Sequence, residues 1–220
     1  MNIFALSSNP IKAAHQMCDK HIVKMPTETC QMLHTNYLYW LYVEENNKEP
    51  SLANLRTFHA SHKGKLMKPA MLNHPSTQWA RESFANFCWL FDHGIALCEE
   101  YTHRYGKRHG SHDRILEMGI LVDKVRGQDE LTTLTIAMDD KYRLDGVEYY
   151  KQNPNASDWD FVIDSYRHYY LEGKWEFARW TNRKSPDWWP DNYYVIKKNE
   201  QIRAFNERFG ANLNLIEGMI

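Results

Sequence analysis

A run of charged residues near the start of the chain, from Asp19 to Glu28, carries the side chains needed for amine chemistry. If this segment is helical, Lys20, Lys24 and Glu28 lie at successive i,i+4 positions on one face, with Asp19 and His21 beside them. A lysine held in an apolar pocket or among cations becomes neutral enough to attack a carbon and form a Schiff base. A carboxylate one turn away can move protons in the same site. The alternative is a surface ladder of ion pairs, worth only about 0.2–0.5 kcal/mol per pair.

A second candidate group lies at the predicted start of a later helix. His74 precedes Pro75, and Trp79 and Arg81 follow within two turns. The first N–H groups of a helix and its dipole favour a bound anion. We therefore expect His74 and Arg81 to contact a phosphate. The alternative is that His74 only caps the helix.

A third group lies near the carboxyl end, in an aromatic loop, Ser185–Pro190, that follows Arg183. Trp188 and Trp189 in this loop stand close to basic side chains. Exposed tryptophan beside arginine suits stacking on an unpaired base, at about 1–3 kcal/mol per base. The alternative is a tryptophan-rich loop that folds back onto the core.

The charge balance bears on any nucleic-acid partner. The chain has 27 Lys and Arg against 28 Asp and Glu, whereas proteins that grip long stretches of DNA usually have a basic excess. The charges are nevertheless uneven: the stretch from Pro50 to Arg81 has five basic residues and no acid, and the segment Arg104–His109 contains Lys107 and is also basic. Two such clusters among aromatics are compatible with a local polyanion site.

Other classes of protein and site are disfavoured. The aromatic fraction of 14% excludes a disordered chain, and no apolar run approaches the ~20 residues that span a bilayer. The start of the chain lacks the pattern of a secretory signal, and the four cysteines form no C-x-x-C pair, so we expect buried thiols in a cytoplasmic protein. His59 and His62 lack the further ligands that a metal site needs, so we expect no metal and no cofactor.

Helical spacing dominates the elements that must position these residues. Asn9-Pro10 begins a helix over Ile11–Lys24, and Pro26 either kinks that helix or opens a second one that ends near Val43. Further helices are predicted from His74 to Tyr105, from Ser111 to near Gly127, after the capping box at Ser157–Asp160, and from Asn199 to Arg208. The segment Leu131–Met138 is strand-like but too solitary to build a sheet.

These patterns predict a mainly α protein, a single helical domain over residues 1–220 with long loops. Its parts are an N-terminal helical segment, 1–45, core helices, 74–126, and C-terminal helices with the tryptophan-rich loop, 157–220.

Several segments, in order, resemble the pyrimidine-dimer DNA glycosylase family typified by phage endonuclease V. They are the leader Met1-Asn2-Ile3 running into a helix that ends at Pro26; His74-Pro75 with Trp79, Trp89-Leu90, Leu97, Glu100 and Arg104-Tyr105-Gly106; and Pro186-Asp187-Trp188-Trp189 with Tyr193-Tyr194. The chain also resembles phage proteins that carry an Asp-Lys-His-x-x-Lys-Met-x-x-Glu stretch.

The resemblance implies a compact all-helical enzyme that acts on ultraviolet-damaged DNA. In that family the α-amine of the chain attacks the sugar C1′ beneath the dimer, the base leaves, and a Schiff base leads to strand cleavage. An α-amine can make this attack because its ordinary pKa of about 8 leaves it partly neutral at pH 7. A carboxylate moves the protons, and a base is flipped out to make room.

The chain departs from the family pattern at two positions. Asn2 normally leaves Met1 in place, so the amine would belong to Met1 rather than to a small second residue. The family's catalytic glutamate lies two residues before the proline, where this chain has Lys24. Three alternatives remain: Asp19 or Glu28 replaces that glutamate, Lys24 is itself the amine, or the chemistry is lost.

Our hypothesis is a DNA-repair glycosylase, with or without an AP-lyase step, that acts on damaged or modified pyrimidines. The candidate catalytic residues are Met1, Lys24, Glu28 and Asp19. The candidate nucleic-acid contacts are Lys20, His21, His74, Arg81, Arg104, Lys107, Arg183, Trp188 and Trp189. The expected partner is duplex DNA, with no membrane and no obligatory protein partner; the compartment would be the infected host cell if a phage encodes the chain. The alternatives are a helical base- or nucleotide-modifying enzyme that uses a metal, and a non-catalytic DNA-binding phage protein.

Overall fold

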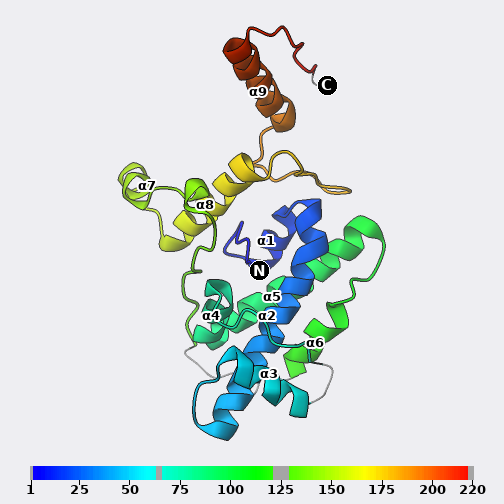
Figure 1. The fold of residues 1–220 in the computed structure, drawn as a ribbon, viewed down its shortest axis with the longest axis vertical. Helices are drawn as coiled ribbons and strands as arrows, with labels where there is room; N and C mark the ends of the chain where they lie inside the picture. The colour runs from blue at the N-terminus through cyan, green and yellow to red at the C-terminus, as the bar shows by residue number, and fades with distance from the viewer. Residues whose placement is uncertain (1, 63–65, 121–128, 218–220) are drawn as a thin grey trace.

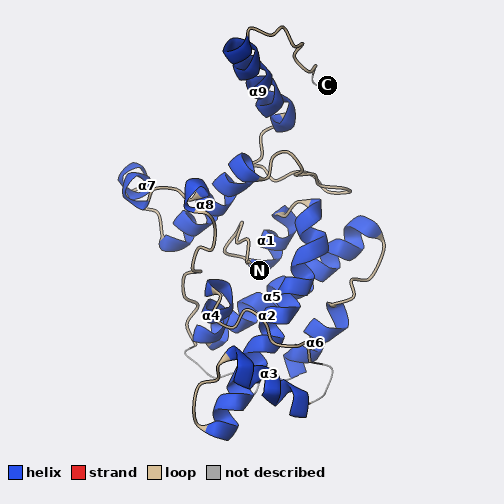
Figure 2. Cartoon of the chain, in the orientation of Figure 1, coloured by secondary structure: helices blue, strands red, loops and turns tan. Residues whose placement is uncertain are grey.

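Two long helices, α2 (Asp19–Asn46) and α5 (Phe84–Tyr105), pack along each other through the centre of the molecule (Figure 1). The structure is a computed structural model, and it describes residues 2–62, 66–120 and 129–217. The remaining elements are α1 (Pro10–Gln16), α3 (Leu52–Ser61), α4 (Pro75–Glu82), α6 (His112–Ile120), the short 3-10 helix η2 (Asp140–Tyr142), α7 (Gly146–Gln152), α8 (Asp158–Gly173) and α9 (Tyr193–Phe209). The prediction of a mainly α fold is confirmed, since the described ranges contain helices and loops and no strand (Figure 2).

The first predicted helix is in fact two helices. Asn9 caps α1 through its side chain and Pro10 stands at the first helical position, as expected, but the chain leaves the helix at Met17 and Cys18. Both residues are fully buried, and the N–H of Asp19 donates to the carbonyl of Arg179 at 2.8 Å. The helix predicted over Ile11–Lys24 is therefore wrong at this break, because the partner of the break lies about 160 residues away.

Pro26 neither ends α2 nor opens a new helix. It lies inside α2, and the helix continues for five more turns to Asn46. Proline removes one i→i−4 hydrogen bond, so helix packing must offset that loss. Pro26 is buried, and so are Met25 before it and Cys30 after it. Because α2 is continuous through Pro26, Lys24 and Glu28 stay on the same helix, two residues before and two residues after the proline.

The helix predicted from His74 to Tyr105 is also interrupted. Ser83 has extended backbone angles, φ −142° and ψ 157°, and its hydroxyl accepts from the N–H of Asn86, so that α4 ends and α5 begins. The side chain of Asn86 donates to the carbonyl of Trp79 at 2.8 Å and to the hydroxyl of Thr132 at 2.7 Å. The end of α5 is as predicted, because Gly106 takes the left-handed conformation there, with φ 63°.

One main hydrophobic core joins the N-terminal segment, residues 2–9, to α1, α2, α4, α5, α6 and α8. Ile3, Phe4, Ala5 and Leu6 are at most 6% exposed, although they form no helix. Three of the four cysteines are buried thiols and Cys88 is half-buried, which agrees with the predicted reduced cysteines. Among the described residues, none of the helices has the length and apolarity needed to cross a bilayer.

In the second half of the chain, one predicted helix start is confirmed and other predicted element boundaries differ. The capping box of α8, Ser157 with Asp160, is confirmed. Leu131–Met138 is an irregular segment, in keeping with its solitary place in the sequence, and the part of the helix predicted from Ser111 that runs from 121 to Gly127 lies outside the described residues. Helix α9 begins six residues earlier than predicted, buries no residue, and projects from the rest of the molecule (Figure 1).

Two buried histidines make the fold sensitive to acid. Burial lowers the pKa of His21 to about 3, with Lys174 and Lys24 adding to the effect, and burial lowers that of His93 to about 4 despite a hydrogen bond to the carbonyl of Pro10. Both imidazoles are therefore neutral in the folded protein near pH 5, whereas in the unfolded chain they bind protons below about pH 6.5.

We expect the free energy of unfolding to fall as the pH drops below about 6.5. Between about pH 6.5 and its pKa in the folded protein, each histidine lowers the free energy of unfolding by about 1.4 kcal/mol per pH unit. The reason is that the unfolded state binds a proton that the folded state does not. Urea unfolding at pH 7 and pH 5 measures the difference. His93→Phe, which keeps a ring on Trp89, should reduce the slope; equal stability at the two pH values in the wild type would contradict this account.

Candidate active site

The candidate site is built on one face of α2, where Lys24 and Glu28 form an i,i+4 ion pair. Lys24 Nζ lies 3.0 Å from Glu28 Oε1, and the two side chains differ sharply in exposure, 69% for Lys24 and 15% for Glu28. The amine thus faces solvent while the carboxylate lies almost inside the protein. The predicted pairing of these two side chains is confirmed as geometry, and it follows from helical spacing alone.

The N-terminal segment reaches the same carboxylate. The backbone N–H of Asn2 donates to Glu28 Oε2 at 3.1 Å, across 26 residues of sequence. Asn2 therefore lies beside the same carboxylate that pairs with Lys24. Met1 itself lies outside the described residues.

His74 also lies near this carboxylate. It is the N-cap residue of α4, and its Nδ1 accepts from the N–H of Ser76 at 3.2 Å. Burial lowers the pKa of the His74 imidazole, and the charge of Glu28 acts in the opposite direction. His74 therefore does cap the helix, as the alternative interpretation expected. The cap also places its imidazole beside Glu28.

Asp19, the other candidate acid, belongs to a different network. Its carboxylate accepts from Arg104 Nη1 at 2.9 Å and from the N–H and hydroxyl of Thr181. Asp19 precedes Glu28 by nine residues of the same helix, a separation of roughly 14 Å along the axis. The structure places Asp19 where it ties α2 to α5 and to the loop before α9, away from Asn2.

Arg104 lies in the interior rather than on a DNA-binding face. Its side chain is 0% exposed, and its donors are taken by Asp19, by Glu100 Oε1 at 2.7 Å and by the carbonyl of His15 at 3.2 Å. Arg183 pairs with both oxygens of the same Glu100. Burial acts to raise the pKa of Glu100, but hydrogen bonds and charge from Arg183 and Arg104 outweigh it and leave that pKa below its usual range. A phosphate at Arg104 would have to displace this network, so the predicted phosphate contact does not fit its burial.

His21 is likewise part of the core. It is 7% exposed, stacks on Phe4 with ring centroids 4.1 Å apart, and forms a hydrogen bond with the hydroxyl of Tyr170. The prediction that His21 touches nucleic acid does not fit this burial. Arg81, which is half-buried, donates to the carbonyl of Leu72 at 2.6 Å and lies over the ring of Tyr39, so it fixes the loop before α4.

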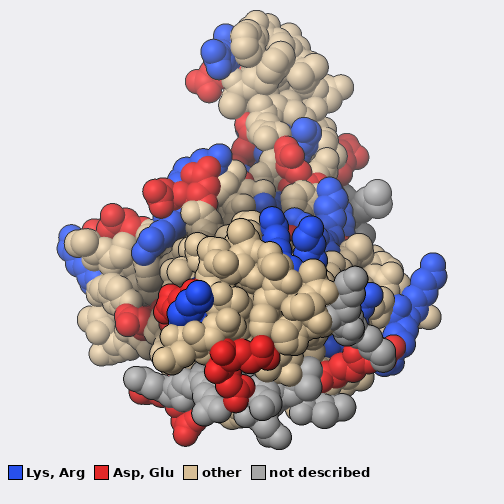
Figure 3. Space-filling view, turned by 60° about the horizontal axis from the view of Figure 1, so that its bottom comes forward, with Lys and Arg blue, Asp and Glu red and all other residues tan. Residues whose placement is uncertain are grey.

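Lys20 and Lys107 are exposed, and both are free of the interior networks described above. Lys20 Nζ lies 4.3 Å from the ring of Phe177. On the face shown in Figure 3, basic and acidic atoms both surround a broad uncharged area. This pattern agrees with the near-neutral charge of the chain and points to few phosphate contacts.

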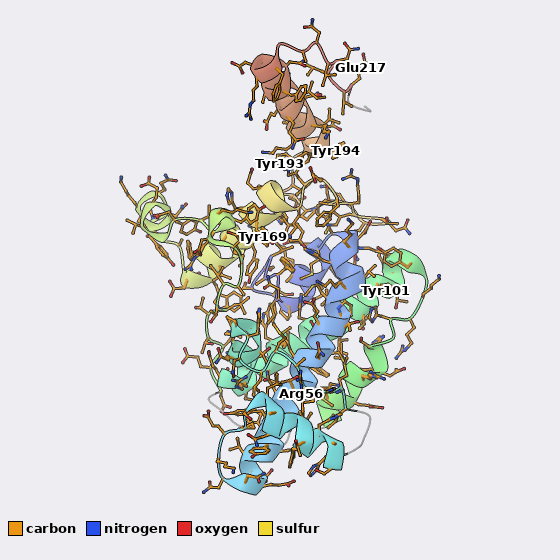
Figure 4. The ribbon with its side chains drawn as sticks, in the orientation of Figure 1. Arg56, Tyr101, Tyr169, Tyr193, Tyr194 and Glu217 are labelled. Atoms are coloured by element: carbon orange, nitrogen blue, oxygen red, sulfur yellow. The ribbon has the colours of Figure 1, made fainter. Side chains whose placement is uncertain are left out.

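The aromatic loop partly folds back onto the protein. Trp188 Nε1 donates to the side chain of Gln16 at 3.2 Å and its ring meets Tyr170 edge-on, while Trp189 packs against Trp180 and Tyr193. Figure 4 shows Tyr193 and Tyr194 where α9 leaves this loop. Trp188 and Trp189 both remain half-exposed, so each keeps a surface available to a partner.

The histidines that raised the metal alternative bind backbone carbonyls, and His62 Nε2 also lies 3.3 Å from Glu45 Oε1. His59 bonds to the carbonyl of Leu66 and His62 to that of Phe58. Within the described ranges, no group of three or more His, Cys, Asp or Glu side chains is placed to hold a metal ion.

Sequence reasoning missed the side chain of Asn2 and its partner Tyr166. Tyr166 Oη donates to Asn2 Oδ1 at 3.0 Å, across 164 residues. No short-range pattern marks either residue, and the single hint is a polar Asn2 directly before the buried run Ile3–Leu6.

One of three comparisons with known proteins identifies a family. The family model described as pyrimidine dimer DNA glycosylase matches residues 1–113, about half of the chain and the part that contains Asn2, Glu28, His74 and Arg104. No curated protein and no solved structure matches the chain. The chain therefore belongs to the pyrimidine dimer DNA glycosylase family, and its function is of that kind, with DNA as substrate.

Proposed function

We propose that the protein removes dimerised pyrimidines from DNA with the α-amine of Met1 as nucleophile and Glu28 as the group that moves protons, and that an AP-lyase step follows. The observation that carries this proposal is the hydrogen bond from the N–H of Asn2 to Glu28 Oε2, 3.1 Å long. The α-amine of Met1 is three covalent bonds from that nitrogen. We propose that this short covalent link lets the amine and Glu28 act on the same nucleotide.

In the first step the neutral amine attacks C1′ of the damaged nucleotide. The new N–C1′ bond forms as the bond from C1′ to the base breaks, and the base leaves with that electron pair. Glu28 stabilises the positive charge that develops on the sugar, and it then takes the proton that the amine loses. Glu28 gives that proton to O4′ as the bond from C1′ to O4′ breaks, which opens the sugar ring, gives a Schiff base between the amine and C1′, and leaves Glu28 ionised again. Removal of a C2′ proton by Glu28 then expels the 3′ phosphate and breaks the strand.

Met1 suits the nucleophilic role better than Lys24 does. The Lys24 side chain is 69% exposed and paired with Glu28, so it lacks the burial that makes a lysine neutral and nucleophilic. An α-amine does not need burial to be nucleophilic, because its ordinary pKa of about 8 leaves a neutral fraction at pH 7. Lys24 then serves as a counter-charge beside the carboxylate, exposed toward the incoming DNA.

The DNA contacts that fit the structure are the exposed and half-exposed candidates. Lys20 and Lys107 have exposed side chains that can reach phosphates, and Trp188 and Trp189 offer half-exposed rings for an unstacked base. His74 lies at the N-terminus of α4 beside Glu28, whereas the guanidinium of Arg183 is held by both oxygens of Glu100. Because few basic side chains are available to phosphates, we expect the affinity for DNA to fall only slightly as the salt concentration rises.

Borohydride trapping on an ultraviolet-irradiated duplex oligonucleotide tests the proposal. We expect a covalent protein–DNA adduct whose mass maps to the N-terminal peptide, together with strand nicking at the dimer. An adduct mapped to the Lys24 peptide would transfer the nucleophilic role to Lys24. If wild-type protein gives neither adduct nor nick on irradiated DNA, the proposal fails.

A further inference from the structure

The side chain of Asn2 closes a small ring of hydrogen bonds with residues far along the chain. Asn2 Nδ2 donates to the carbonyl of Ala137 at 2.7 Å, and Tyr166 Oη donates to Asn2 Oδ1 at 3.0 Å. The N–H of Ala137 in turn donates to Tyr166 Oη at 3.2 Å. The ring joins three elements: the N-terminal segment, the irregular segment Leu131–Met138, and α8.

The ring is anchored in the interior. Tyr166 is 0% exposed, and burial raises the pKa of its hydroxyl well above the ordinary range, so the hydroxyl keeps its proton and can donate to Asn2. The ring of Phe4 packs edge-on against Tyr166 at 5.8 Å. One residue further along α8, Arg167 Nη2 donates to the carbonyl of Leu6 at 3.1 Å. Helix α8 therefore contacts the N-terminal segment at both ends of the buried residues Ile3–Leu6, at Asn2 through Tyr166 and at Leu6 through Arg167.

Such an anchor matters because the ends of chains are ordinarily mobile. At Asn2 the side chain is held by Tyr166 and Ala137 while the backbone N–H points at Glu28, so the direction of the chain at this residue is fixed relative to the carboxylate. A nucleophile held at the right distance gains much of its rate from orientation, and a misplacement of about 1 Å can cost about 100-fold.

We infer that Tyr166 and Ala137, acting through Asn2, are positioning residues for the N-terminal nucleophile. This inference rests on the proposed function, and it extends it, because both residues lie beyond the matched range 1–113. The second half of the chain thus completes the active site that the first half carries. The effect of Tyr166 passes through its hydrogen bond to the side chain of Asn2.

Tyr166→Phe tests the inference, since it removes one hydroxyl and keeps the buried ring. We expect kcat for dimer cleavage, and the rate of borohydride trapping, to fall about 10- to 100-fold with KM unchanged. The matched control is Tyr170→Phe, on the next turn of α8 and equally buried, whose hydroxyl bonds to His21 instead of Asn2. Tyr170→Phe should lose similar stability in urea and keep the wild-type kcat.

A second variant guards against misfolding of the first. Asn2→Leu removes the side-chain bonds to both Tyr166 and Ala137, and its large side chain should still keep Met1 on the chain. We expect the same fall in kcat at constant KM. Equal kcat in Tyr166→Phe, Tyr170→Phe and wild type, or equal losses in the two tyrosine variants, would overturn the positioning role while leaving the proposed function intact. A wild-type protein that neither traps nor nicks would overturn the proposed function itself.

Discussion

Glu28→Gln is expected to lower kcat for cleavage at pyrimidine dimers by about 10²–10⁴-fold, the usual contribution of a positioned acid–base group. Glutamine keeps the size of the side chain and an oxygen that can accept the N–H of Asn2, so the N-terminal segment should stay in place. It loses the negative charge that faces the sugar cation and the ability to take a proton. The affinity for undamaged DNA should change little, because Glu28 is 15% exposed and paired with Lys24.

Single-turnover cleavage of an irradiated oligonucleotide measures the effect. Glu99→Gln is the matched control, since Glu99 is an exposed glutamate on α5 that lies outside the site, and this variant should cleave at the wild-type rate. Wild-type kcat in Glu28→Gln would remove Glu28 from the mechanism. Asp19 is a poor substitute in that event, because its oxygens are bound by Arg104 and Thr181.

The features that the sequence predicted well are those whose hydrogen bonds close within one or two turns. Asn9 before Pro10, Ser157 with Asp160, and Gly106 after α5 are all local capping chemistry, and all three are confirmed. The same holds for Lys24 and Glu28, four residues apart on one helix. Local spacing is enough to place such pairs without knowledge of the rest of the fold.

The features that the sequence did not predict depend on partners far along the chain. The break before Asp19 is fixed by the carbonyl of Arg179, and the break at Ser83 is accompanied by bonds from Asn86 to Thr132. The contact of Asn2 with Tyr166 spans 164 residues. No window of local periodicity contains both ends of such a bond, so only the folded chain shows them.

The burial of Arg104 shows the same limit at a charged residue. Its place near the end of α5, in a basic cluster, favours an exposed side chain that meets phosphate. In the structure Glu100, one turn before it, turns it inward, and Asp19 meets it from α2. A basic residue can thus look like a DNA contact in sequence while its charge is used to join helices.

Arg104→Met should therefore destabilise the fold by about 3–5 kcal/mol, as expected when one member of a buried charge network is removed. Glu100 would keep Arg183 and the nearby His15, and Asp19 would keep Thr181, so both carboxylates would lose their buried arginine partner. Urea unfolding at pH 7 measures the loss. The exposed Arg108, on the loop after α5, offers a matched control: Arg108→Met should leave the unfolding midpoint unchanged.

The same variant separates a structural arginine from one that binds phosphate. At a temperature where Arg104→Met remains folded, the plot of log affinity for DNA against log salt should keep its wild-type slope, because no phosphate contact has been removed. Loss of a real phosphate contact would reduce that slope by about 1. Wild-type stability combined with such a reduced slope would return Arg104 to the DNA-binding surface. A large loss of stability with an unchanged slope assigns it to the interior network that holds α1, α2 and α5 together.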